Sequence, residues 1–195
     1  AYNHMKTSIA NIIRPDASSY HTFFFDMATN EPLRGETHQG FSDDSSWARG
    51  QSWAVYGLAL CYHYTHEEAI LPLFERVTKY FIDHLPEDYV PYWDLIFSDG
   101  SCEPRDTSAA AIAACGILEM EKYYHNQEFL DIAKKMMSSL SEKYTTVDYL
   151  QSNGIIKDGM YSRKHGHKSE CTSWGDYFYL EALMRMKKSD WKIYW

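Results

Sequence analysis

The pattern of hydrophobic and polar positions along this chain is typical of helices joined by long polar loops. Apolar residues recur every three or four positions over residues 46–64, 65–85, 126–144 and 174–188, which predicts a helix at each place. Residues 107–120 are apolar almost all round, which predicts a helix that is buried on every side. A buried helix, a short turn, an amphipathic helix and a long loop, repeated in that order, are typical of helical hairpins in a ring with functional loops at one end.

Two shorter patterns precede these helices. Residues 1–14 predict a further helix, which Pro15 ends. Residues 19–26 are aromatic and β-prone, and a turn is expected at residues 29–32. Together they predict a short two-stranded ribbon across residues 20–36.

Residue types that favour helix N-termini precede most of the predicted helices. Residues 43–46, with the sequence Asp-Asp-Ser-Ser, come before the first long helix, and residues 65–68 form a capping box before the next. Asp106 and Asn126 are expected to cap the helices that follow them. Asp94 lies in a long loop, and we expect it to orient that loop.

The composition narrows the classes of partner and location. The formal net charge is −8 at pH 7, which argues against nucleic acid or an anionic membrane surface as the main partner. No apolar run approaches the roughly 18 residues of a membrane-spanning helix, so we expect no membrane segment. The length favours a single domain. The four cysteines lie far apart and are expected to be free thiols, which is compatible with the cytoplasm. The expected location is cytoplasmic or periplasmic.

The stretch from residue 38 to residue 64 carries the candidate chemistry. A polar, glycine-broken loop runs into an apolar helix and places Gln39, Trp47, Arg49 and Trp53 around the start of that helix. Indole rings stack on sugar rings, and the planar guanidinium of arginine binds a carboxylate through two parallel hydrogen bonds. The 16 tyrosines and six tryptophans of the chain indicate either a well-packed aromatic core or, in addition, a carbohydrate groove with partly exposed rings.

Residues 39–53 resemble the signature of a known family. Their pattern, Gln-Gly-x-x-Asp-Asp-Ser-x-Trp-Ala-Arg-Gly-Gln-x-Trp, is similar to that of the unsaturated glucuronyl hydrolases, glycoside hydrolase family 88. Further stretches match the same family in the same order, at residues 20–26, 32–35, 91–94, 105–109 and 174–179. The resemblance implies an all-α fold, the (α/α)6 toroid of helical hairpins, of which the predicted helices supply about half. We therefore expect residues 1–195 to be one partial domain, the C-terminal half, with the N-terminal half missing.

The resemblance also implies a reaction. Family members release a 4,5-unsaturated uronic acid from oligosaccharides made by polysaccharide lyases. A carboxylic acid protonates C4 of the unsaturated ring, water adds at C5, and the hemiketal opens and frees the neighbouring sugar. In the family this acid/base Asp precedes the stretch that contains His21, on a helix outside this chain. We therefore expect no catalytic residue in the chain, and no activity from the chain alone.

The same resemblance implies five residues that bind the substrate. His21 and Gln39 match the positions that contact substrate and water. Trp47 and Trp53 match the walls that stack on the sugar ring. Because these two indoles are six positions apart on a helix, we expect one to face the groove and the other to pack beside it. Arg49 matches a partner for the polar groups or the carboxylate of the substrate.

Each of these residues also has a purely structural interpretation. His21 in an aromatic strand can be a hydrogen-bonded scaffold residue, and Gln39 can simply cap the loop that contains it. Arg49, on the first turn of its helix, can form an ordinary salt bridge with Asp43 or Asp44.

A basic cluster at residues 163–168 stands out on an acidic chain. It is either a solvated loop or a contact for a sulfated or carboxylated sugar, and Lys168 is the candidate residue for that contact. His165, His167 and Cys171 are residue types that bind zinc, but their spacing fits no strong template and no fourth ligand is evident. We expect neither a metal nor a cofactor.

Two other functions remain open from the sequence. One is an unsaturated rhamnogalacturonyl hydrolase, which shares the toroid and the chemistry. The other is a non-catalytic helical module that binds a carbohydrate or a protein. The expected partners are an unsaturated acidic oligosaccharide and either the missing N-terminal half or a second copy of the chain, because half a toroid exposes apolar helix faces.

Overall fold

The structure is a computed structural model that describes residues 2–188 and 190–193. Within these residues the chain forms helices and one antiparallel two-stranded sheet. The elements are, in order, α1 (Tyr2–Ile12), β1 (Thr22–Phe25), β2 (Pro32–Glu36), α2 (Ala48–Thr65), α3 (Ile70–Asp83), α4 (Thr107–Met120), α5 (Gln127–Lys143), the 3-10 turn η1 (Arg163–His165) and α6 (Ser173–Lys187). Each predicted helix and the predicted ribbon are thereby confirmed.

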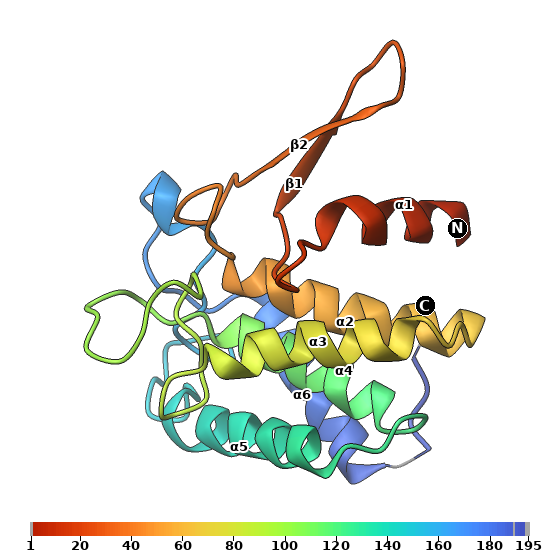
Figure 1. Ribbon diagram of the computed structural model, residues 1–195. Helices are drawn as coiled ribbons and strands as arrows, with labels where there is room; N and C mark the ends of the chain where they lie inside the picture. The colour runs from red at the N-terminus through yellow and green to blue at the C-terminus, as the bar shows by residue number, and fades with distance from the viewer. Residues whose placement is uncertain (1, 189, 194–195) are drawn as a thin grey trace.

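The helices form an inner row and an outer layer. The inner helix α4 contacts α2 on one side and α6 on the other, while α3 packs on α2 and α5 packs on α4 (Figure 1). Every residue of α4 from Thr107 to Ile117 is buried, which confirms a helix enclosed on all sides. Its small side chains permit a close approach to α2, where an added Cβ at Gly116 would lie 2.8 Å from the Cα of Tyr56.

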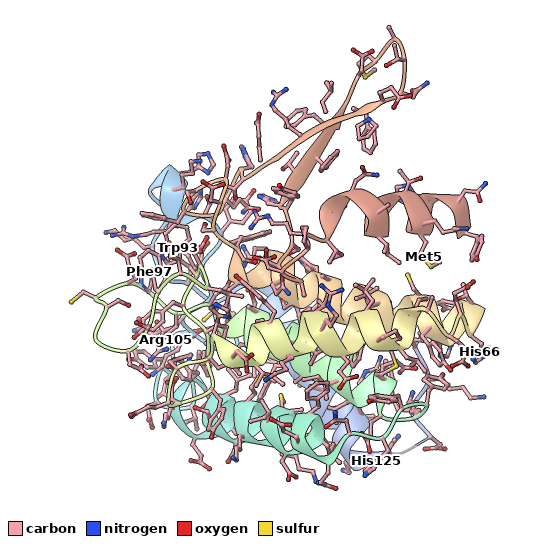
Figure 2. All side chains as sticks on the ribbon, in the orientation of Figure 1. Met5, His66, Trp93, Phe97, Arg105 and His125 are labelled. Atoms are coloured by element: carbon pink, nitrogen blue, oxygen red, sulfur yellow. The ribbon has the colours of Figure 1, made fainter. Side chains whose placement is uncertain are left out.

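The long loops gather at the end of the molecule where α2, α4 and α6 begin (Figure 1). Trp93, Phe97 and Arg105 lie in this loop region, and His66 and His125 lie toward the opposite end of the helices (Figure 2). Trp47 and Arg49 lie at the start of α2 and therefore at this loop end.

The ribbon of β1 and β2 brings two parts of the predicted site together. Thr22 pairs with Glu36 at the open end of the ribbon, and the strands project away from the helices (Figure 1). His21 precedes β1 and Gln39 follows β2, so the antiparallel pairing places them side by side.

The predicted caps of α2 and α3 are wrong. The residue at the N-terminus of α2 is Trp47, which makes no side-chain cap. The carboxylate of Asp43 accepts a hydrogen bond from the backbone N–H of Thr37 instead, at 2.7 Å. The hydroxyl of Thr65 donates to the carbonyl of Cys61 at 2.6 Å within α2, and α3 starts later, after Ala69, without a side-chain cap. Both side chains therefore bond backbone groups outside the helix that each was expected to cap.

The other two predicted caps have different outcomes. The side chain of Asn126 accepts from the backbone N–H of Phe129 at 3.1 Å, which confirms it as the cap of α5. Asp106 occupies the N-cap position of α4, but its side chain makes no cap hydrogen bond. That carboxylate binds Arg49 on α2 instead, at 2.9 Å.

Candidate functional site

Asp94 holds the loop that leads into α2. Its buried carboxylate oxygen Oδ2 accepts from the backbone N–H of Phe41 and from the hydroxyl of Ser45, both at 2.8 Å. Trp47 forms an isolated antiparallel bridge with Asp94, which fixes the same loop from its other end. The prediction that Asp94 orients a loop is confirmed, and the loop that it holds contains Gln39.

His21 lies against this loop and against the first indole of α2. The backbone N–H groups of His38 and Gln39 donate to its Nδ1 at 3.0 and 3.1 Å. Its ring lies 4.3 Å from that of Trp47, centroid to centroid. Burial lowers the pKa of His21 to about 4, and repulsion from the neighbouring His38, when that ring is protonated, and from the Arg49 guanidinium acts in the same direction.

Gln39 links two loops that are far apart in the sequence. Its side chain is 9% exposed, and its Nε2 donates to the backbone carbonyl of Tyr161 at 2.6 Å. Arg49 donates to the same carbonyl oxygen, through one terminal nitrogen at 2.7 Å. The loop around Tyr161 is therefore tied to the start of α2 by two side chains of the predicted site.

Arg49 is buried and held on several sides. Its other terminal nitrogen donates to a carboxylate oxygen of Asp106 at 2.9 Å and to the hydroxyl of Ser108 at 3.1 Å. The guanidinium lies 4.6 Å from the ring centre of Trp47 and 5.2 Å from that of Trp174. Arg49 thus does form an ion pair, but with a carboxylate 57 positions away. Its role toward a substrate stays a prediction.

The two indoles of α2 differ in exposure. Trp53 is 36% exposed and makes an edge contact with Phe178, at 5.1 Å between ring centroids. Trp47 is 7% exposed and lies beneath His21 and Arg49. Both rings line the groove between α1 and α2, so the expectation that only one indole faces it is not met, although Trp53 is the more exposed of the two.

A groove of about 750 Å³ runs between α1 and α2. His21, Trp47 and Trp53 line it at and beyond the loop end of α2, whereas Gln39 and Arg49 do not line it. Its remaining walls are mostly apolar, and Met5 is on the face of α1 that turns toward α2 (Figure 2). Within the described part of the chain, no aspartate or glutamate lines the groove.

Comparison with known proteins decides the family. The sequence matches Glycosyl Hydrolase Family 88 over residues 7–189. The chain belongs to glycoside hydrolase family 88. It is 47% identical over 201 residues to the unsaturated chondroitin disaccharide hydrolase of Streptococcus agalactiae, and 49% identical over 201 residues to that of Streptococcus pneumoniae. Each match covers 100% of this chain and 50% of the relative, so the family 88 chain spans about half the length of these relatives.

Solved structures of family 88 relatives confirm the fold. The crystal structure of the unsaturated glucuronyl hydrolase from Streptococcus agalactiae has a TM-score of 0.94 and 47% identity, and the match covers 100% of this chain and 50% of that one. A mutant of that enzyme complexed with dGlcA-GalNAc6S has a TM-score of 0.88, with 100% of this chain and 53% of that chain covered. The helices described above therefore form part of an α/α toroid.

Several residues around the site of this family 88 chain were not predicted. Ser108 links the carboxylate of Asp106 to the indole N–H of Trp174, at 2.6 and 3.2 Å. These residues lie in the stretches at 105–109 and 174–179 that resemble the family. The sequence therefore showed the motifs but did not show which side chains contact one another. Tyr161 takes part through its backbone carbonyl, which leaves no signal in the sequence.

The remaining sequence candidates lie apart from the groove. Lys168 is exposed in the loop after η1 and does not line the groove. His165 bonds Ser162 through Nδ1 at 2.6 Å, whereas His167 contacts the ring of Tyr161. Cys171 lies 3.7 Å from the hydroxyl of Ser152. Among the described residues, no three or more His, Cys, Asp or Glu side chains are grouped as metal ligands would be.

The structure also bears on the expectations for membrane helices and for cysteines. No helix within residues 2–188 and 190–193 combines the length and the apolar character that crossing a membrane requires. The four cysteines are free thiols, as predicted, and Cys115 is the one that is buried.

Proposed function

We propose that this chain forms one wall of the sugar groove of an unsaturated glucuronyl hydrolase. The reaction releases a 4,5-unsaturated uronic acid from oligosaccharides generated by lyases. The observation that carries the proposal is the groove beside α2, where His21, Trp47 and Trp53 come together at the loop end of a toroidal fold. The relatives support this substrate class, since two are unsaturated chondroitin disaccharide hydrolases and the crystal structure of one related enzyme holds dGlcA-GalNAc6S.

The chemistry sets what the groove has to supply. The unsaturated ring contains an enol ether conjugated with a carboxylate. A proton added at C4 leaves an oxocarbenium-like centre at C5, water adds there and loses a proton, and the hemiketal opens to release the neighbouring sugar. Attack at C5 differs from ordinary glycosidase chemistry, in which two carboxyl groups flank the anomeric carbon. One carboxyl group that donates and later accepts a proton is the central requirement.

The described residues supply binding and orientation. The exposed face of Trp53 offers a flat apolar surface for a sugar ring, and His21 lies at the same groove. Gln39 and Arg49 act through the lining residues, because Gln39 bonds His21 and the guanidinium of Arg49 lies over the ring of Trp47. We propose that the charge of Arg49, partly neutralised by Asp106, attracts the uronate carboxylate without contacting it.

The proton donor is proposed to come from outside the described groove lining, which contains no carboxyl group. The chain alone should then bind an unsaturated disaccharide without consuming its double bond. The same observation favours a second candidate function, a sugar-binding module that never completes a catalytic site. An active protein containing this chain distinguishes the two.

A chimera provides the test. Residues 1–195 replace the matching half of the Streptococcus agalactiae enzyme, to which they are 47% identical. We expect the chimera to consume unsaturated chondroitin disaccharide, followed as loss of the absorbance of the conjugated double bond, and His21→Ala to cut turnover strongly. A folded chimera without turnover would favour the binding module. Preference for an unsaturated rhamnogalacturonan disaccharide would favour the rhamnogalacturonyl hydrolase.

Lys168 is proposed to contact acidic groups beyond the unsaturated ring. The loop that carries it is tethered to the site, because the ring of His167 contacts Tyr161, whose carbonyl binds Gln39 and Arg49. In the chimera, Lys168→Ala should raise the KM for a sulfated disaccharide more than for an unsulfated one. An equal change for both sugars would leave residues 163–168 as a solvated loop.

A further inference from the structure

The hydrogen bonds of His21 fix where its ring carries a hydrogen. Nδ1 accepts from two backbone N–H groups, those of His38 and Gln39, at 3.0 and 3.1 Å. A ring nitrogen that accepts a hydrogen bond carries no hydrogen, and a neutral imidazole has its single hydrogen on the other nitrogen. The neutral ring is therefore the tautomer with its hydrogen on Nε2.

The surroundings of His21 also oppose a second proton. A hydrogen on Nδ1 would face two N–H donors and would remove both hydrogen bonds. The titratable and charged groups that act on the ring are His38 from the loop after β2 and Arg49 from α2. The guanidinium repels a positive imidazolium, and so does His38 when it carries a proton. The third neighbour, Trp47, offers an indole ring. Burial acts in the same direction and lowers the pKa of His21 to about 4.

We infer that His21 is held as a neutral imidazole that presents Nε2–H to the groove as a hydrogen-bond donor and takes no part in proton transfer. His21 lines the groove, and among the described residues no side chain or backbone group bonds Nε2. The matching group on a ligand is an oxygen lone pair, from a hydroxyl, a ring oxygen or a carboxylate of the sugar. A water molecule beside C5 can be oriented by this donor, but it must lose its proton to another group.

The choice of ligand rests on the proposed function, whereas the state of the ring does not. The ring can therefore be tested on the 195-residue chain without any sugar. Long-range proton–nitrogen NMR spectra of the chain labelled with ¹⁵N-histidine report which ring nitrogen carries hydrogen, and the His21→Gln spectrum identifies the His21 signals. We expect Nε2–H and a bare Nδ1 that persist from about pH 7.5 to about pH 5, whereas the urea-unfolded chain titrates near pH 6.5. A hydrogen on Nδ1, or a folded-state midpoint near 6.5, would overturn the inference.

A matched pair of variants tests the donor itself. His21→Gln keeps an N–H donor near the position of Nε2, and His21→Asn keeps an acceptor near the position of Nδ1 but loses the donor. With unsaturated chondroitin disaccharide as the probe, we expect His21→Asn to weaken binding about tenfold and His21→Gln by less than about threefold. The reverse order would show that His21 acts only through the loop that it holds. If the NMR spectra show the predicted tautomer but the chain does not bind the disaccharide, the result contradicts the proposed function. The inference on the protonation state of His21 then still holds.

Discussion

At the scale of single residues, the guanidinium of Arg49 is held between two indoles and neutralised by one carboxylate. The side chains of Arg49 and Asp106 are 4% and 0% exposed, so loss of the carboxylate charge leaves a cation without its partner away from water. We predict that Asp106→Asn lowers the free energy of unfolding by about 3 kcal/mol. Urea unfolding followed by circular dichroism measures this change.

Asp44→Asn is the matched control, because Asp44 was one of the two candidate partners expected from the sequence and is exposed. It should change the free energy of unfolding by less than about 0.5 kcal/mol. Equal effects of the two substitutions would contradict the assignment of the ion pair to Asp106.

His21 should make the stability of the chain sensitive to acid. Its pKa is about 4 in the folded chain and near 6.5 for a free imidazole, so the unfolded chain binds more protons between these values. The contribution of His21 is complete above about pH 6.5 and is lost as the pH falls toward about 4. Calorimetry across this window should show a steeper fall of Tm for the native chain than for His21→Gln. Parallel curves would contradict the depressed pKa.

The sequence pointed to the site residues better than to their contacts. Family-like motifs singled out His21, Gln39 and Arg49, and the structure places all three within one connected set of side chains and loops. The partners of these residues lie far along the chain, and one of them is the backbone carbonyl of Tyr161. The contact with the Tyr161 carbonyl was not predictable, because every residue has a backbone carbonyl. The contact with Asp106 was not predictable, because nothing in the local sequence distinguishes this carboxylate from those of the other acidic residues.

At the scale of elements, two helical glycines should respond in opposite directions to the same added methyl group. An added Cβ at Gly116 of α4 would lie 2.8 Å from the Cα and N atoms of Tyr56, whereas none of the neighbouring atoms lies within 4 Å of one at Gly57 of α2. We predict that Gly116→Ala destabilises the chain by about 1–3 kcal/mol, because it forces α2 and α4 apart.

Gly57→Ala should stabilise the chain by about 0.5–1 kcal/mol, because alanine loses less backbone entropy in a helix than glycine. Chemical denaturation measures both variants under one set of conditions. A neutral Gly116→Ala would contradict the close crossing of α2 and α4.

Helix positions followed from the sequence because the apolar period is a property of each segment by itself. Helix caps were predicted less well, because a side chain that can cap a helix can instead bond a group in another part of the fold. Asn126 caps as predicted, whereas Ser45 donates to the distant carboxylate of Asp94 and Thr65 bonds within the preceding helix. Local propensity decides a cap only where tertiary contacts offer no alternative.

At the scale of the whole molecule, both ends of the inner row are apolar and open. The groove lies along α2 at one end of the row. At the other end, α6 exposes apolar side chains at every third position, namely Tyr177, Leu180, Leu183 and Met186. In a closed toroid each inner helix has an inner neighbour on both sides. We propose that in the active protein further helices, from the same polypeptide or from a second copy, cover the α6 edge and the apolar part of the α2 edge away from its loop end, so that the groove stays open where His21 and Trp53 line it.

This proposal predicts self-association of the isolated chain. Light scattering after size exclusion should give a mass above 22.8 kDa for the 195-residue chain, and Leu180→Ser should lower it. Leu150→Ser is the matched control, because Leu150 is 97% exposed but lies in a loop away from both edges. A well-folded monomer would contradict the covering of these edges and favour the module that acts alone.

The most direct test is an NMR titration of the 195-residue chain with unsaturated chondroitin disaccharide, read at the indole N–H signals and as the absorbance of the double bond. The account predicts that the Trp53 signal shifts and the absorbance stays constant. Trp53→Ala should weaken binding about tenfold, whereas Tyr149→Ala, which removes an exposed ring that does not line the groove, should leave it unchanged. An unmoved Trp53 signal would contradict the sugar-binding wall, and loss of absorbance would contradict a proton donor outside the described groove.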